Sequence, residues 1–224
     1  MINENDLISL QKMLIPTEIE SSLDKASVAN LCRTTADLKM AGICIESKHI
    51  SFAWNCLERH KIPILIRENF NGNKKKALAK LTEFFDAGVH FCELDISMIS
   101  DLIEQNFPTK KIIVSIPYHE ISSRKKAIEI MNSFSPFYGI SLVQDGSSEI
   151  EKLTAVFRLF EGIKDVQSIP KWFLFDLPPT KNAPLFAQNI MRLGEKKLIG
   201  IDTKISFHLP QKTIKYFTRI NGGK

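Results

Sequence analysis

Cysteine is scarce in this chain, and no two cysteines form a C-x-x-C pair. Cys32, Cys44, Cys56 and Cys92 each stand in an apolar stretch, where a reduced and buried thiol is common. This usage argues against a disulfide framework and a zinc knuckle. The chain also lacks an apolar run of about twenty residues and the charged start and small-residue cleavage site of a secretion signal. We therefore expect a cytoplasmic protein without a membrane partner.

Several motifs of metal and nucleophile chemistry are absent as well. The sequence has no H-E-x-x-H motif, no cluster of histidines, no calcium-loop spacing and no G-x-S-x-G elbow. Its net charge is only +5, and its lysines stand in short runs without interleaved aromatic residues. We expect no metal, no cofactor and no nucleic-acid partner, and we interpret the lysine runs as solvated faces.

A repeating pattern is present throughout. Short apolar, β-branched runs alternate with longer amphipathic segments eight times. The runs predict strands over 12–17, 42–47, 62–68, 89–96, 111–119, 138–145, 171–178 and 197–204. This order predicts an α/β fold, a single (β/α)8 TIM barrel spanning residues 1–224, with flexible ends over 1–11 and 221–224. An open doubly wound sheet is disfavoured because the turn after the first strand has no glycine.

Two of the predicted helices carry recognisable end signals. Gly88 fits the position just past the helix that begins in the 74–76 lysine run. Either Ser147 or Ser148 fits the N-cap of the next clear helix, and Gly162 fits the position just past its end.

Polar residues gather where the predicted strands end, which is where a barrel of this kind places its active site. They are Thr17, Glu18, Glu46, Lys48, Arg67, Glu68, Glu93, Asp95, Tyr118, His119, Glu120, Gln144, Asp145, Asp176, Asp202 and Lys204. Strand alternation puts Glu46 and Lys48 on one face, where the pair could hold a polar ligand.

Each candidate has two interpretations. Arg67 either binds a ligand or closes an ion pair with Glu46 or Glu93. His119 is either a general acid or base, or a loop residue bonded to backbone.

Two further residues leave the same choice open. Asp176 either takes part in chemistry or caps the next helix. Lys204 either forms an imine with a substrate or is solvated. The segment "TKISFHLPQKT" lacks the glycines of phosphate-binding barrels, which disfavours sugar phosphates.

The order of motifs resembles the type I 3-dehydroquinate dehydratase family. "IIVSIPYHEISS" is similar to the family's S-x-H-[DN]-F stretch, "GICIESKHI" to its E-L-R-x-D strand, "IPILIRENFNGN" to its arginine strand, and "FHLPQKTI" to its terminal S-A-P-G-Q segment. The opening "KMLIPTEIESSLDKA" looks like the family's first strand and helix.

The resemblance implies a shikimate-pathway lyase that converts 3-dehydroquinate to 3-dehydroshikimate. It makes His119 the catalytic residue and Glu46, Lys48, Arg67 and Gln211 the residues that hold a small anionic carboxylate. It also implies a homodimer.

One departure from the family pattern is decisive. The imine-forming lysine would fall on or beside Ile140, where the chain has none. We therefore expect a divergent member whose imine route is lost or impaired, with Lys204 or Lys48 as an alternative amine. Two other hypotheses stay open. One is a non-catalytic protein that binds a small carboxylate, and the other is a barrel enzyme of another reaction with His119 as general acid and base.

Overall fold

The computed structural model describes residues 4–17, 24–67, 74–104 and 107–218. Within them, eight parallel strands close into a barrel in sequence order, and the last strand pairs with the first. The strands are β1 (Leu14–Thr17), β2 (Ile43–Ile45), β3 (Ile64–Arg67), β4 (Phe91–Asp95), β5 (Ile112–Pro117), β6 (Gly139–Val143), β7 (Trp172–Asp176) and β8 (Lys204–Pro210). The predicted (β/α)8 TIM barrel is confirmed.

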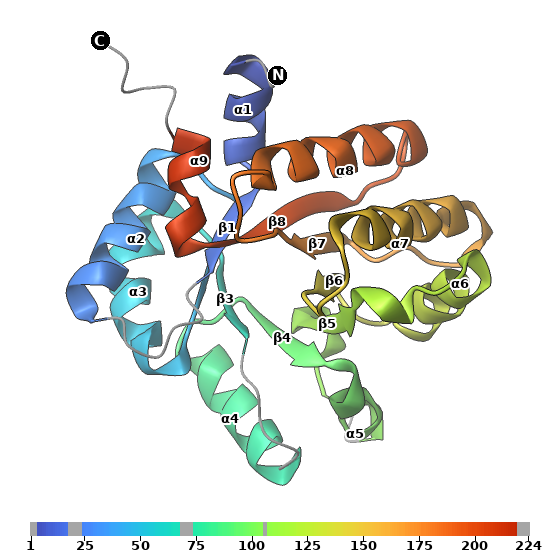
Figure 1. Cartoon of the computed structure of the whole chain (residues 1–224). Coiled ribbons are helices and arrows are strands. Elements are labelled where there is room, and N and C mark those ends of the chain that lie inside the picture. Colours follow the sequence, from blue (N-terminus) through green and yellow to red (C-terminus); the bar gives the residue numbers. More distant parts are fainter. Residues whose placement is uncertain (1–3, 18–23, 68–73, 105–106, 219–224) are drawn as a thin grey trace.

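Helices surround the strands on the outside (Figure 1). They are α1 (Glu4–Gln11), α2 (Lys25–Asp37), α3 (Ile50–Leu57), α4 (Lys74–Asp86), α5 (Ile99–Glu104), α6 (Arg124–Ser133), α7 (Glu149–Gly162), α8 (Ala183–Lys197) and α9 (Lys215–Thr218). Among the described residues, no helix has the length and apolar character needed to span a membrane.

The structure decides between the two predicted N-cap serines and shifts one of the two predicted glycine positions. Ser148, not Ser147, is the N-cap of α7, and it forms a reciprocal capping box with Glu151. Gly88 follows α4 with a φ of +98°, and a Cβ there would lie 2.5 Å from a ring carbon of Trp54. Gly162 is the last residue of α7 rather than the residue beyond it.

The N-terminal end is more ordered than the sequence indicates. Residues 4–11 form α1, whose Leu7 and Leu10 are buried. The Gln11 side chain donates a hydrogen bond to the carbonyl of Phe217 at 2.6 Å. This helix is short and only weakly amphipathic, so the chain around it, rather than its own pattern, stabilises it. Residues 221–224 lie outside the described part.

The last strand is displaced from its prediction. The first seven strands lie inside their predicted ranges, but β8 covers Lys204–Pro210 rather than 197–204. The apolar residues of 197–204 mislead because Ile199, in the turn after α8, is 82% exposed. In the true strand, Ser206 and His208 interrupt the apolar run, yet both are buried inside the barrel.

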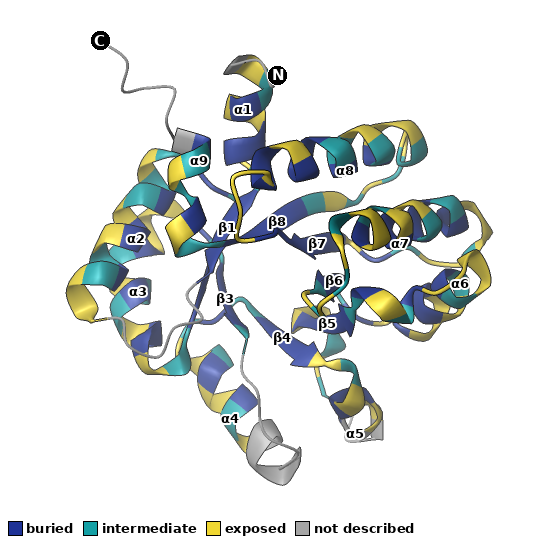
Figure 2. Ribbon diagram, viewed as in Figure 1, coloured by how far each residue is buried: buried dark blue, intermediate teal, exposed yellow. Residues whose placement is uncertain are grey.

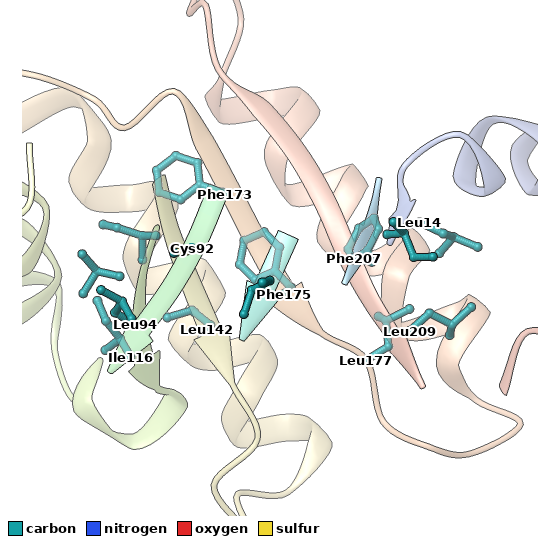
Figure 3. Packing of buried hydrophobic residues seen from close by; sticks show 14 of the residues in the cluster. Leu14, Cys92, Leu94, Ile116, Leu142, Phe173, Phe175, Leu177, Phe207 and Leu209 are labelled. Carbon is teal, nitrogen blue, oxygen red and sulfur yellow. The ribbon is translucent and has the colours of Figure 1, made fainter. Parts of the chain in front are cut away.

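Two apolar layers hold the barrel together. The larger fills the space between the strands and the helices, with Phe173, Phe175, Phe207 and Leu209 among its members (Figure 3). Figure 2 shows the same arrangement, with buried residues on the strands and inner helix faces and exposed residues outside. The smaller layer fills the barrel interior and comprises Ile15, Cys44, Leu65, Ile113, Trp172 and Leu174. Towards the carboxyl ends of the strands, polar side chains replace this apolar filling.

Candidate active site

Arg67 organises the polar part of the barrel interior. It ends β3, and its guanidinium binds Asp176 on β7 through two hydrogen bonds, of 3.0 Å from Nη1 and 2.7 Å from Nη2. Nη2 also donates to Glu93 Oε1 on β4 at 2.8 Å, and Ser115 Oγ on β5 donates to the same oxygen at 2.9 Å. The planar guanidinium fork suits such paired carboxylate contacts. The ion-pair interpretation of Arg67 therefore describes its contacts in this structure, with Glu93 as the foreseen partner.

The electrostatics of this cluster follow from its burial. Burial alone raises the pKa of Glu93, but the Arg67 guanidinium and His208 outweigh it and hold that pKa well below its usual range. Burial likewise opposes the charge on Arg67, while Asp176 and Glu93 raise its pKa well above the usual value. The Cys44 thiol, buried beneath the cluster, has its pKa raised to about 12 by burial. Arg67 and Glu93 therefore stay ionised together, and neither is suited to exchange protons near neutral pH.

His208 joins this cluster from β8. Its Nε2 lies 2.9 Å from Glu93 Oε2, at ion-pair distance although off the ideal hydrogen-bond direction. Its Nδ1 lies 2.8 Å from the hydroxyl of Thr17 at the end of β1. The side chain is only 2% exposed. Both ring nitrogens of His208 thus face protein atoms, and the ring acts as a structural link between strands.

His119 has a different environment. It lies in the short 3₁₀ turn Tyr118–Glu120 that follows β5, and its side chain is 63% exposed. Its Nδ1 lies 2.8 Å from Asp145 Oδ2, and the same oxygen accepts the backbone N–H of His119 at 2.6 Å. Asp145 follows β6, and its side chain is 6% exposed. The structure therefore supplies a histidine at the barrel mouth with a carboxylate behind it.

The charge of Asp145 determines which ring nitrogen of His119 carries the proton. Burial raises the pKa of Asp145, but hydrogen bonds from the backbone N–H groups of His119 and Ser147 outweigh it and lower the pKa to about 2. An ionised carboxylate only accepts hydrogen bonds, so Nδ1 of His119 carries the proton at neutral pH. Nε2 is then the lone-pair nitrogen of the neutral ring. Its nearest acidic group is Glu120 Oε1 at 3.8 Å, which leaves it open to a substrate proton.

A groove of about 350 Å³ lies beside His119. The turn after β5 forms one wall and the first turns of α7 form the other. Its lining offers the polar side chains of Ser122, Ser147, Glu151, Thr154 and Arg158. This size is at the lower end of the range of ligand pockets, so the groove suits a small polar molecule.

Asp176 connects the two histidine regions. Its Oδ2 accepts both Arg67 Nη1 and the backbone N–H of Gln144 at 3.1 Å, and Gln144 precedes Asp145 in the chain. Asp176 does not cap the next helix, whose N-cap is Asn182. Asp176 therefore ties the Arg67 cluster to the backbone one residue before the carboxylate that orients His119.

A buried amine stands next to Gln144. Lys152 of α7 is 5% exposed, its Nζ hydrogen-bonds the side-chain oxygen of Gln144, and it lies 5.8 Å from the ring centroid of Tyr118. Burial, with Asp176 and Asp145 next in weight, raises the pKa of Tyr118 well above its usual value. The phenol therefore keeps its proton and donates a hydrogen bond to the backbone carbonyl of Asp176 at 3.3 Å.

The other predicted site residues lie apart from this arrangement. Glu46 and Lys48 form an ion pair of 2.6 Å just after β2, with side chains 27% and 46% exposed. Glu46 precedes the 3₁₀ turn Ser47–His49 and Lys48 lies within it, so the two do not share one strand face. Gln211 begins the 3₁₀ turn Gln211–Thr213 after β8 and so lies at the same end of the barrel as His119. Glu18 and Glu68 lie outside the described residues.

Lys204 contradicts its predicted place. It is the first residue of β8, so it lies at the amino-terminal end of the barrel, opposite His119. The prediction was wrong because the strand was assigned to 197–204, which made residue 204 a strand end. The described strands carry no other lysine, and an imine with a substrate at the mouth cannot form through Lys204.

Three residues of the arrangement were missed or given another role. Asp145 was noted among the strand-end residues but not paired with His119. His208 and Ser115 were not considered at all. Period-2 alternation in "KISFHLP" is a signal that could have placed His208 inside the barrel, because Phe207 and Leu209 alternate with it.

Among the described residues, no three histidine, cysteine or acidic side chains are grouped as a metal ion requires.

The comparisons by sequence find nothing, whereas the comparison of structures finds similar proteins. No protein-family model matches the chain, and no curated protein matches it. Solved structures do match. A proposed deoxyribose-phosphate aldolase from Toxoplasma gondii has a TM-score of 0.72 and 11% identity, covering 96% of this chain and 96% of that chain. The deoxyribose phosphate aldolase from Aeropyrum pernix has a TM-score of 0.63 and 12% identity, covering 99% of each chain.

A third relative carries a different activity. The N-acetylmannosamine-6-phosphate 2-epimerase from Clostridium perfringens has a TM-score of 0.55 and 14% identity, covering 98% of each chain. These likenesses show the fold alone. At identities this low, a shared barrel does not imply a shared reaction.

The resemblance to type I 3-dehydroquinate dehydratases is overturned. Aldolase barrels, most of them named as deoxyribose-phosphate aldolases, stand among the structural relatives where dehydroquinate dehydratases were expected, so both the family assignment and the predicted conversion of 3-dehydroquinate in the shikimate pathway were wrong. The physical reason lies in the motifs themselves. An apolar strand that ends in a polar residue recurs at every unit of any (β/α)8 barrel, and "FHLPQKTI" matches because it contains most of β8.

Proposed function

We propose that this chain is a barrel enzyme that transfers a proton at a carbon atom beside a carbonyl group of a small polar substrate. His119 is the general base and acid, and Asp145 is the carboxylate that orients it. The observation that carries the proposal is the contact of 2.8 Å between His119 Nδ1 and Asp145 Oδ2, with the rest of the imidazole exposed at the mouth.

Nε2 of His119 performs both proton transfers. It first accepts a proton from the carbon next to the carbonyl group, and Asp145 stabilises the imidazolium that results. The imidazolium Nε2–H, once exchanged with solvent, then returns a proton to the same carbon of the enolate, so that the carbonyl compound and the neutral histidine are both restored. A base positioned in this way contributes about 10²- to 10⁴-fold in rate.

The relatives support this reaction class without deciding the substrate. Aldol cleavage and epimerisation beside a carbonyl group both require a base that moves a proton, and these names occur among the structural relatives. The groove lined by hydroxyl groups favours a substrate with hydroxyl substituents. An acid–base route without a strand lysine fits the composition of the described strands. We also propose a cytoplasmic location, consistent with four cysteines that carry thiols rather than disulfides.

Deuterium incorporation from heavy water tests the proton transfer by itself, so the experiment does not require the natural substrate. The purified chain is mixed with hydroxyacetone, glycolaldehyde, acetaldehyde or pyruvate, and the loss of the signals from protons beside the carbonyl group is followed by proton NMR. We expect catalysed exchange with at least one hydroxylated probe. His119→Ala lowers that rate by about 10²-fold or more, and Asp145→Asn lowers it as well.

His60→Ala is the matched control. His60 is an exposed histidine on the connection between α3 and β3 and is remote from the mouth, so its removal leaves the exchange rate unchanged. Exchange that is absent with every probe, or that persists in His119→Ala, contradicts the proposal. Binding of a small carboxylate without exchange would instead favour a non-catalytic binding protein.

A further inference from the structure

A second cavity opens at the amino-terminal end of the barrel, opposite His119. Its volume is about 680 Å³, well within the range of ligand pockets. It is lined by residues at the starts of the strands, such as Phe91, Trp172 and Lys204, and by the last turns of α8. The mouth residues His119 and Asp145 do not line it, so the site is independent of the proposed reaction.

Aromatic rings form one wall of this cavity. Phe91 and Tyr138 stack with ring centroids 4.4 Å apart, and Trp172 meets Phe91 edge-on at 5.4 Å. Trp172 is 4% exposed, so its ring is held in place within the wall. Aromatic rings pair favourably in stacked and edge-on arrangements. The wall therefore suits a flat aromatic ring.

The charges at the rim favour an anion. Lys12 and Lys204 line the cavity, both are exposed, and neither forms a salt bridge within the described part of the chain. Glu195 is the one acidic side chain among the lining residues. The nearby Lys171 differs, because it is paired with Asp202 at 3.0 Å and does not line the cavity. Two unpaired ammonium groups against one carboxylate leave the rim positive.

We propose that this cavity binds a small planar aromatic molecule that carries a carboxylate group. The ring packs against Phe91, Tyr138 and Trp172, and the carboxylate lies towards Lys204 and Lys12. Aromatic pairing and the release of water from an apolar wall supply the affinity, and the lysines select the anion.

Titration with 2-naphthoate tests the proposal, with its neutral counterpart 2-naphthamide as the comparison. Isothermal titration calorimetry on the full chain measures the dissociation constants. We expect one site per chain and binding of 2-naphthamide that is about fivefold weaker or worse. Lys204→Gln weakens the binding of 2-naphthoate by about the same factor.

Two control variants locate the ligand. Lys171→Gln removes a neighbouring paired lysine and leaves binding unchanged, and His119→Ala leaves it unchanged because that residue lies at the other end of the barrel. The proposal is overturned if 2-naphthoate does not bind, if Lys204→Gln binds it as tightly as the parent chain, or if His119→Ala weakens it equally.

A second copy of the chain is the competing occupant. Ile199 lines the cavity and is 82% exposed, so an interface there would bury it. Sedimentation that shows a dimer dissociated by Ile199→Asp, together with no binding of 2-naphthoate, would replace the small-molecule site by an interface.

Discussion

His119 and His208 each stand beside a carboxylate at the carboxyl end of the barrel, yet their surroundings differ in every other respect. His208 is 2% exposed, and its two nitrogens face Glu93 and Thr17. The His119 side chain is 63% exposed, and its Nδ1 lies 2.8 Å from Asp145, while its Nε2 comes no nearer than 3.8 Å to the acidic Glu120. A histidine with both nitrogens occupied can link strands but cannot meet a substrate. A free nitrogen at a solvent-accessible mouth, backed by an ionised carboxylate, is the arrangement that general acid–base catalysis requires.

The largest expected effect is on the rate rather than on stability. His119→Ala should lower proton exchange by about 10²- to 10⁴-fold, while the free energy of unfolding changes by no more than about 0.5 kcal/mol, as for other exposed positions. His208→Phe should do the reverse and destabilise the fold, because it removes the ring whose nitrogens lie 2.9 Å from Glu93 and 2.8 Å from Thr17 inside the barrel. Exchange kinetics and urea unfolding on both variants check the comparison. If both variants lost the same activity and the same stability, the two histidines would not have the different roles described by their contacts.

The next effect concerns the ion-pair cluster to which His208 belongs. Arg67→Met should lower the free energy of unfolding by about 3 to 5 kcal/mol, because it leaves the carboxylates of Glu93 and Asp176 buried without their main cation. Lys48→Met breaks a more exposed ion pair and should cost no more than about 1 kcal/mol. Urea denaturation of both variants provides the measurement. Similar losses would show that the burial of Glu93 and Asp176 does not make the Arg67 contacts more stabilising than an exposed ion pair.

Thr17→Val should have an intermediate effect. It keeps the shape of the side chain but removes the hydroxyl that meets His208 Nδ1 at 2.8 Å, so we expect a loss of about 1 to 3 kcal/mol. Thr17→Ser retains the hydroxyl and should recover most of that loss. The hydroxyl also donates to the Ile15 carbonyl at 3.0 Å, so the two variants test both of its contacts together, and equal unfolding in urea would show that the hydroxyl adds no stability.

The smallest expected effect is a pH dependence of stability that comes from Asp145, the carboxylate paired with His119. The pKa of Asp145 in the folded chain is about 2, below its ordinary value of 3.8, so its ionised form stabilises the fold. That stabilisation is fully present above the ordinary value and is lost as the pH falls towards 2. The stability advantage of the parent chain over Asp145→Asn should therefore be larger at about pH 6 than at about pH 3. A difference that does not change with pH would contradict the shift.

The sequence predicts the fold well and the site only in part, for physical reasons. Alternation of apolar strands with amphipathic helices is a local signal, and it locates the first seven strands within their ranges. It fails for β8 because the buried Ser206 and His208 look like surface residues until the network that satisfies them is known. Likewise, His119 can be recognised as a strand-end histidine. Its pairing with Asp145 depends on the neighbouring ends of β5 and β6, a contact across 26 residues of sequence that no motif records.

The tautomer of His119 tests the central claim most directly. Nitrogen-15 NMR of the imidazole rings near neutral pH reports which nitrogen carries the proton. The structure predicts that neutral His119 holds its proton on Nδ1 and that Asp145→Asn removes this preference. A neutral His119 protonated on Nε2 in the parent chain would leave no base at the mouth and would contradict the account.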